Sequence, residues 1–253
     1  ADMGARVIKI ERPVIGDFVR HYDTRVAGLS SHFVWVNRSK ESLCLDLKDP
    51  EAQDILHKLL AKADILVQNL APGSADRLGL SFDALSTKNP RLIVCDISGY
   101  GDGGPYFDKK AYDLLIQSEA GFLSITGMDH EMAKAGNSIA DIAAGMYAYS
   151  NILGALIARA NTGKGRHIEI SMLESMVEWM GFPMYYAYQN QSPPQRNGAS
   201  HATIYPYGIF KTGDNNTVML GLQNEREWVC FCDVVLMQKN LAQDSRFANN
   251  HLR

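Results

Sequence analysis

The residues Ser138-Ile139-Ala140-Asp141 contain the side chain with the clearest chemical potential in this sequence. Ser138 and Asp141 have the spacing of a capping box, in which both side chains bond backbone amides at the start of a helix. The helix dipole also favours a carboxylate in the first turn. The same exposed amides are suited to an anionic reaction centre, where a carboxylate can attack a thioester or a phosphoryl group. The spacing favours a helix-capping role for Asp141, and a role as a nucleophile is the alternative.

The other reactive side chains form no comparable arrangement. Tyr112-Asp113 fits a helix start in which the tyrosine packs into the core. The histidines have no metal-site spacing, and His57 and His167 are expected to be solvated or hydrogen-bonded. Cys230 and Cys232 lie two residues apart in a helical pattern, so their side chains point to different faces, which argues against zinc. We therefore expect no metal site.

Composition excludes several classes of protein. The 253 residues include 25 basic and 28 acidic side chains, for a formal net charge of −3. This balance gives no electrostatic footprint for nucleic acid or an anionic membrane surface. No apolar run is long enough to span a bilayer. Four cysteines are too few for a disulfide scaffold and favour a reduced, cytoplasmic compartment.

Strand and helix patterns alternate in the first half of the chain. Short apolar runs predict strands over 7–10, 42–47, 64–67 and 92–97. Asp49 can cap a helix that begins at Pro50, with Ile55, Leu59 and Leu60 on its apolar face. Strands separated by helices predict βαβ units and a mainly parallel sheet. Ligands bind such sheets at the carboxyl ends of the strands, so the loops at 11–13, 47–48, 69–73 and 98–105 are the places to look.

The second half begins with a long helix from Ser138. Its predicted buried face consists of Ile142, Met146, Tyr149, Leu153 and Leu156. A strand over 166–170 and a helix over 173–188 follow. The polar residues after them read as a linker, before a hairpin around 213–216 and a helix capped by Asn224. We expect a large domain over 1–188, a linker over 189–203 and the start of a smaller domain over 204–253.

The ends of the chain are unusual. Residues 1–5 look like the last turn of a helix that ends at Gly4, and residues 246–253 stop without a finished element. We expect the sequence to be a fragment of a longer protein.

Nine short motifs occur along almost the whole chain in a specific order. They are residues 4–13, 37–40, 64–73, 90–93, 99–101, 111–113, 126–127, 140–141 and 162–165. In this order and spacing the chain resembles the family III CoA-transferases. That group includes formyl-CoA transferase, the carnitine CoA-transferases and, as close relatives, the α-methylacyl-CoA racemases.

The resemblance implies that Asp141 is the nucleophile of a CoA transfer between carboxylic acids. Its carboxylate would attack the donor thioester to form a mixed anhydride, which CoA converts into an aspartyl-CoA thioester. The acceptor acid then receives CoA. Coenzyme A and acyl-CoA are substrates in this scheme, and no cofactor is bound permanently. Amides at the helix start and in glycine-rich loops would stabilise the oxyanions.

The resemblance also implies a set of residues that bind CoA. They are Arg12, Leu45, Asp46, Leu47, Lys48, Asn69, Leu70, Ala71, Arg77, Lys110, Ala111, Tyr112 and Asp113. These positions lie at expected strand ends and helix starts. CoA carries a pyrophosphate and a 3′-phosphate, so fixed cations suit it.

Residue 112 bears on the choice between transferase and racemase. The racemases have a histidine before the aspartate as one of two acid–base groups, whereas this chain has Tyr112. A tyrosine phenol, with an ordinary pKa of about 10, is a poor partner for moving an α-proton at neutral pH. The transferase is therefore favoured, with a racemase or an inactive CoA-binding paralogue as alternatives. The acids themselves cannot be assigned, and small dicarboxylates such as succinate follow only by analogy.

The resemblance implies an α/β fold as well. Its members have a Rossmann-like large domain with a mainly parallel sheet, a smaller α+β domain and an interlocked homodimer. They are longer than this chain at both ends, and the missing N-terminal segment would hold the first strand and helix.

Overall fold

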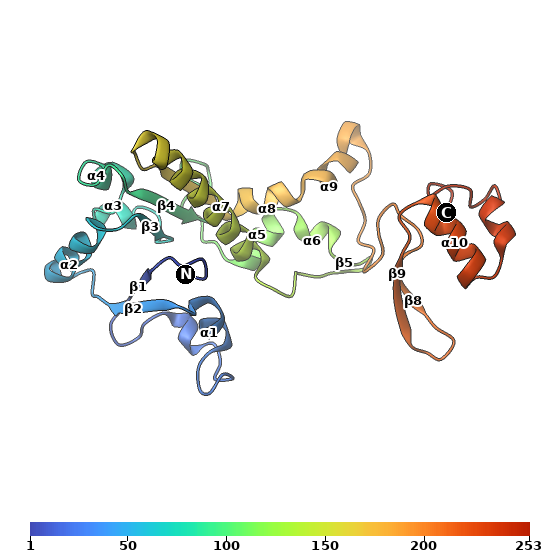
Figure 1. Ribbon diagram of the computed structural model, residues 1–253, viewed down its shortest axis with the longest axis horizontal. Helices are drawn as coiled ribbons and strands as arrows, with labels where there is room; N and C mark the ends of the chain where they lie inside the picture. The colour runs from blue at the N-terminus through green and yellow to red at the C-terminus, as the bar shows by residue number, and fades with distance from the viewer. The chain divides into compact units, whose positions relative to one another are not determined.

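The computed structural model describes residues 1–253 and is a mixed α/β structure (Figure 1). It divides into two units, each made of two stretches of chain. The first unit contains residues 1–96 and 152–168, and the second contains residues 97–151 and 169–253. No helix combines the length and the apolar character that a bilayer-spanning helix needs.

Parallel strand pairs form the sheets of the first unit. β1 (Val7–Glu11) pairs with β2 (Lys40–Cys44), and β3 (Ile65–Gln68) pairs with β4 (Ile93–Ser98). β7 (His167–Ser171) completes a three-stranded sheet in the order β3-β4-β7. The predicted mainly parallel arrangement is confirmed for these two pairs.

The second predicted strand was placed too late. β2 ends at Cys44 rather than Leu47, because the next residues turn. Asp46 Oδ1 accepts a hydrogen bond from the Lys48 amide at 3.0 Å, and the Asp49 amide donates to the Asp46 carbonyl at 2.8 Å. An aspartate that bonds the backbone two residues on is typical of a turn.

The first unit also contains short helices. They are η1 (Phe18–His21), α1 (Ser31–Asn37), α2 (Pro50–Leu60), α3 (Ser74–Arg77) and α4 (Phe82–Ser86). Of these, α2, α3 and α4 pack on its hydrophobic core. As predicted, Asp49 caps α2, because its Oδ1 accepts from the Glu51 amide at 2.9 Å. Of the three residues predicted for its apolar face, Leu60 is buried, Leu59 is partly buried and Ile55 is 44% exposed. The buried residues Ala52, Leu56 and Leu60 follow one another at four-residue spacing.

The turn after α7 (Ile139–Thr162) packs closely against the residues just before β4. A Cβ at Gly165 would lie 1.9 Å from the Leu92 carbonyl oxygen, so only glycine fits. The Gly165 amide donates to the Pro90 carbonyl at 2.8 Å. Two of the sequence motifs, 90–93 and 162–165, therefore meet in the first unit.

The second unit is mostly helical, with two hairpins. Its elements are α5 (Asp113–Glu119), α6 (Phe122–Ile125), β5 (Gly127–Met128), β6 (Glu131–Met132), α8 (Met172–Trp179), α9 (Gly181–Tyr186), η2 (Tyr188–Asn190), β8 (Tyr207–Lys211), β9 (Thr217–Gly221), α10 (Glu225–Cys230), η3 (Phe231–Val235) and η4 (Lys239–Gln243). β8 and β9 form the predicted antiparallel hairpin, and Asn224 caps α10 as predicted.

The predicted helix over 173–188 is interrupted. α8 ends at Trp179 and α9 begins at Gly181, with Met180 between them. Pro183, in the first turn of α9, has no N–H to bond a carbonyl of the preceding turn, so one continuous α-helix is disfavoured.

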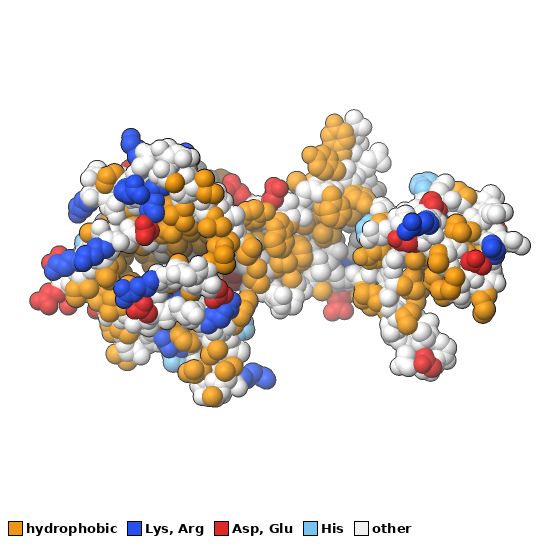
Figure 2. Space-filling model, viewed as in Figure 1, with side chains coloured by type: hydrophobic (Ala, Val, Ile, Leu, Met, Phe, Trp, Pro, Cys, Tyr) orange, Lys and Arg blue, Asp and Glu red, His pale blue; other side chains and the backbone are white.

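The buried face of α7 (Ile139–Thr162) differs from the prediction. Ala140, Ala143, Ala144, Ala148 and Ala155 are buried. The predicted residues Met146, Tyr149 and Leu153 are exposed, and Met146 is 58% exposed. The alanines allow close packing against the helix backbone and leave the larger side chains on the surface. Figure 2 shows hydrophobic side chains spread widely over the visible face.

Candidate active site

Asp141 lies in the first turn of α7, and the residue as a whole is exposed although its carboxyl group is partly buried. The preceding residue is held by a carboxylate from elsewhere in the sequence, since the Ala140 amide donates to Asp113 Oδ1 at 2.9 Å. The Ile139 amide donates to the Asn137 carbonyl at 2.9 Å. These two amides are therefore already hydrogen-bonded within the protein, so they are not free to stabilise an oxyanion.

Asp113 is itself held by a buried glutamine. Gln117, one turn further along α5, is fully buried and donates from Nε2 to Asp113 Oδ2 at 2.7 Å. Its Oε1 accepts from the Ala135 amide at 2.9 Å. Both oxygens of Asp113 thus accept hydrogen bonds, and two points of the backbone before and within α7 are tied to α5.

The surroundings of Asp141 disfavour its charged form. Partial burial of the carboxyl group raises its pKa, and the negative charge of Asp113 raises it further. A carboxylate that is solvent-accessible yet poorly solvated is suited to attack an electrophile brought to it. Asp141 is thus a carboxyl group of raised pKa in the first turn of α7.

The glycine-rich loop over residues 98–105 packs against the segment before Asp113. A Cβ on Gly99 would lie 2.2 Å from the Ala111 Cβ, so glycine is needed there for close packing. The Leu173 amide donates to the Gly99 carbonyl at 3.0 Å, and Tyr100 is buried in a cluster with Ala140. At Gly99, therefore, the loop 98–105 closely approaches another segment of the same chain.

The prediction that Tyr112 packs into the core is wrong. Its side chain is 58% exposed at the residue before α5. The Lys110 ammonium lies 5.2 Å from the Tyr112 ring centroid, a distance suited to a cation–π contact. Lys110 and Tyr112 are therefore both accessible, whereas Asp113 is partly buried and bonded to Gln117 and Ala140.

Arg12 and Leu45 follow paired strand ends in the first unit, where Glu11 is the register partner of Cys44. The Leu45 side chain is buried in the core, so it offers a ligand only its backbone. Glu11 accepts two hydrogen bonds from Arg20, each 2.8 Å long. The Arg20 side chain is the largest cause of a Glu11 pKa lowered to about 2. This ion pair fixes the strand end from which Arg12 extends.

The turn after β2 holds the next candidates in place. Gln53 Nε2 donates to the Leu47 carbonyl at 2.8 Å, while Asp46 bonds the Lys48 amide. The Asp46 and Lys48 side chains are exposed. Lys48 is thus available to a phosphate at a backbone position fixed by the turn.

The loop after β3 holds the last candidates of the first unit. Asn69, Leu70 and Ala71 are exposed, and the Leu70 amide donates to Gln68 Oε1 at 2.7 Å. Arg77 is exposed and donates to Ser74 Oγ at 2.7 Å. The first unit therefore carries three exposed cations near these loops, namely Arg12, Lys48 and Arg77.

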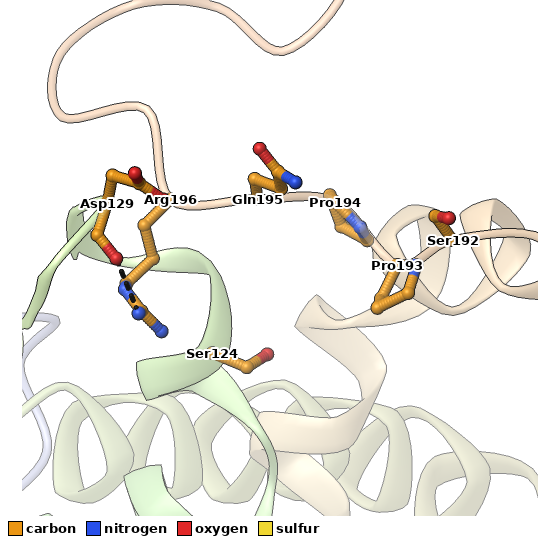
Figure 3. Close-up of a pocket in the computed structure, with 7 residues that line it drawn as sticks. All are labelled: Ser124, Asp129, Ser192, Pro193, Pro194, Gln195 and Arg196. Atoms are coloured by element: carbon orange, nitrogen blue, oxygen red, sulfur yellow. Dashed lines mark hydrogen bonds between the residues drawn. The ribbon is translucent and has the colours of Figure 1, made fainter.

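A shallow pocket elsewhere in the second unit contains none of these candidates. Ser124, Asp129 and residues 192–196 line it (Figure 3). Arg196 donates to the carbonyls of Met128 and Asp129 at 3.0 and 2.8 Å. The arginine therefore fastens the 192–196 segment to the β5–β6 hairpin, and the pocket is assigned no function.

Sequence reasoning missed the polar residues that hold the site. Gln117 is four residues after Asp113, a spacing that brings helix side chains together, and this signal was available. Gln68, Asp96 and His167 are bonded across three strands, which only the strand register brings together.

The chain is thus an α/β protein with a carboxyl group in the first turn of α7. The sequence model of CoA-transferase family III matches residues 1–253, so the chain belongs to that family.

Individual relatives agree with this membership. The chain is 37% identical to the acetyl-CoA:oxalate CoA-transferase of Acetobacter aceti and 34% identical to the human succinyl-CoA:glutarate CoA-transferase. Each match covers all of this chain and 65% or 58% of the relative, respectively. The chain thus spans about three fifths of the length of these curated relatives.

Solved structures share the fold. A CaiB/BaiF family protein from Brucella suis superposes with a TM-score of 0.83 at 34% identity, covering 100% of this chain and 68% of that one. A hypothetical protein from Mycobacterium tuberculosis gives a TM-score of 0.86 at 25% identity, covering 100% and 66%.

Proposed function

We propose that the protein transfers coenzyme A from an acyl-CoA thioester to a carboxylic acid, with Asp141 as the nucleophile. The observation that carries this proposal is the Asp141 carboxyl group, which is accessible in the first turn of α7 and has a raised pKa. The names of the relatives, which are CoA-transferases acting on acids such as oxalate and glutarate, support it.

The reaction proceeds in two symmetric halves. An Asp141 oxygen attacks the thioester carbonyl carbon, the C–S bond breaks, and CoA leaves as a thiolate. The thiolate then attacks the aspartyl carbonyl of the mixed anhydride and expels the donor acid. An acceptor carboxylate attacks the resulting aspartyl-CoA thioester and releases the thiolate again. Attack of the thiolate on the acceptor's acyl carbon gives the new acyl-CoA and regenerates Asp141. Covalent catalysis thus divides one difficult exchange into easier steps.

Asp113 and Gln117 act as positioning residues in this scheme. The bond from the Ala140 amide to Asp113 fixes the backbone next to Asp141. Gln117 fixes the orientation of the Asp113 carboxylate. The Asp113 charge also keeps the Asp141 carboxylate basic.

CoA is held, in this proposal, by the residues that the family resemblance implied. The cations Arg12, Lys48, Arg77 and Lys110 are exposed and suited to its phosphates. The loops at 45–48 and 69–71 and the segment 110–113 supply backbone and side-chain contacts. The protein is also proposed to form an interlocked homodimer and to lie in the cytoplasm. Sedimentation tests the dimer, and cell fractionation tests the location.

An exchange assay tests the proposal. The full chain is incubated with succinyl-CoA and a panel of small carboxylic acids, and new acyl-CoA is measured. Asp141→Asn abolishes transfer, whereas Asp83→Asn, which changes an exposed carboxylate in the first turn of α4, leaves it intact. Full transfer by Asp141→Asn contradicts the mechanism. Exchange of an α-proton without CoA transfer indicates a racemase, and CoA binding with neither reaction indicates an inactive paralogue.

A further inference from the structure

Three polar side chains from three neighbouring strands form one hydrogen-bonded chain in the first unit. Gln68 on β3 donates from Nε2 to Asp96 Oδ1 on β4, and the distance is 2.8 Å. His167 on β7 donates from Nε2 to the other oxygen, Asp96 Oδ2, also at 2.8 Å. Gln68 and Asp96 are register partners, so the backbone pairing itself brings these two side chains together.

The chain of bonds ends on the backbone of a loop. Gln68 Oε1 accepts from the Leu70 amide at 2.7 Å. Because Asp96 takes the Nε2 side of the glutamine amide, the oxygen is left facing Leu70. Each donor in the series meets an acceptor, so the arrangement is self-consistent.

The imidazole at the other end is held by stacking. The His167 ring lies parallel to the Phe82 ring, with an interplanar angle of 5° and a centroid distance of 5.4 Å. Phe82 packs against the hydrophobic core of the first unit. His167 and Asp96 are only partly exposed, with side-chain exposures of 34% and 25%. The series therefore links the core of the unit to an exposed loop.

We propose that Gln68, Asp96 and His167 are positioning residues for the CoA-binding loop Asn69–Ala71. This inference rests on the proposed function, because the role of that loop is part of it. The three side chains act through the Leu70 amide and make no contact with CoA themselves. A loop held in one conformation before binding has less conformational freedom to lose when the ligand arrives.

Two pairs of variants separate positioning from simple packing. Gln68→Leu keeps the approximate size and removes both hydrogen bonds. Gln68→Glu keeps an acceptor for Leu70 but sets a second carboxylate against Asp96. His167→Leu removes the donor to Asp96, and His167→Gln restores one. His57→Leu, on α2 and outside the network, is the control.

The experiment uses the full chain and CoA as the probe. Calorimetry gives the Kd for CoA, and hydrogen exchange of the Leu70 amide is followed without CoA. Gln68→Leu and Gln68→Glu raise the Kd about five- to tenfold, as expected for loss of an ordinary hydrogen bond, and Gln68→Leu also speeds Leu70 exchange. His167→Leu raises the Kd about threefold, while His167→Gln and His57→Leu stay within about twofold of the wild type.

The outcomes distinguish this inference from the proposed function. If the wild type binds CoA and the Gln68 variants bind it equally well, the inference is overturned and the proposed function stands. If Leu70 exchange is the same in Gln68→Leu and the wild type, the network does not hold the loop, and the inference fails whatever CoA does. If the folded wild type does not bind CoA at all, the proposed function fails, and the CoA role of the loop fails with it.

Discussion

The carboxylate of Asp113 accepts a hydrogen bond from the amide of Ala140, 27 residues later in the chain, at a distance of 2.9 Å. The bond joins the first residue of α5 to the first turn of α7, immediately before Asp141. Asp113 thus fixes the backbone beside Asp141, and its negative charge raises the pKa of the Asp141 carboxyl group.

Neutralising Asp113 is expected to lower the pKa of Asp141. In Asp113→Asn the repulsion that opposes ionisation of Asp141 is gone, so the acidic limb of the kcat/KM profile moves to lower pH. Burial, the larger cause of the raised pKa, remains in this variant, so only part of the shift is removed. The quantity compared is the position of the limb and not the absolute rate, because the new side-chain amide at residue 113 also faces Gln117 Nε2. The exposed control Asp108→Asn leaves the limb in place, and a move of the Asp113→Asn limb to higher pH refutes the coupling.

Removing the buried amide of Gln117 is expected to destabilise the second unit. Gln117→Leu leaves Asp113 Oδ2 and the Ala135 amide without the partners they have now. We expect a loss of about 3 kcal/mol in the free energy of unfolding, together with slower transfer. Denaturant unfolding measures the first and the exchange assay the second. Gln53→Leu, which removes one bond from a half-buried glutamine, costs about 1 kcal/mol. Equal losses in both variants would contradict the special role of Gln117.

The Glu11–Arg20 ion pair is expected to make stability depend on acid. The pKa of Glu11 is lowered from 4.5 in the unfolded chain to about 2 in the folded one, with Arg20 as the main cause. The folded state therefore gains stability above pH 4.5, and the gain disappears as the pH falls towards about 2. Its size is about 3 kcal/mol, since one pKa unit corresponds to about 1.4 kcal/mol.

Glu11→Gln is expected to abolish most of this pH dependence, which urea unfolding between pH 2 and 6 measures. Glu41→Gln breaks an exposed pair with Arg6 and leaves the acid dependence of the wild type essentially unchanged. If the unfolding curves of Glu11→Gln and the wild type keep the same pH dependence, the assignment to Glu11 is wrong.

Adding one methyl group at Gly99 is expected to disturb the site. In Gly99→Ala the new Cβ meets the Ala111 Cβ at 2.2 Å, so the glycine-rich loop and the 110–113 segment must separate. Overpacking of this kind costs about 1–3 kcal/mol, and transfer activity falls with it. Gly104→Ala, where no atom lies within 4 Å of the added Cβ, is the matched control. Thermal unfolding and the exchange assay should separate the two variants, and identical behaviour would mean that the close approach has no role.

Local rules predicted the elements of this fold well. The cap at Asp49, the hairpin after residue 207 and the strand patterns all follow from interactions between residues near each other in sequence. The buried face of α7 did not follow, because Ala140, Ala143 and Ala148 form a second apolar stripe beside the larger side chains. Which stripe is packed depends on the neighbours of the helix.

In the candidate site, too, local sequence predicted some features, and others depend on tertiary packing. Asp141 was singled out by its position at a helix start, and the order of the motifs predicted its role as nucleophile, which stays a prediction. The bond between Asp113 and Ala140 spans 27 residues, and the contact between His167 and Asp96 spans 71. Such pairs depend on how the strands and helices pack, which no local spacing encodes.

Covalent trapping shows directly whether Asp141 carries the acyl or CoA group during transfer. The full chain is incubated with succinyl-CoA, treated with hydroxylamine, digested and examined by mass spectrometry. We expect a hydroxamate on Asp141 that depends on the CoA donor and is absent from Asp141→Asn. Turnover with no modification at Asp141, or the same modification on another carboxylate in Asp141→Asn, would contradict it.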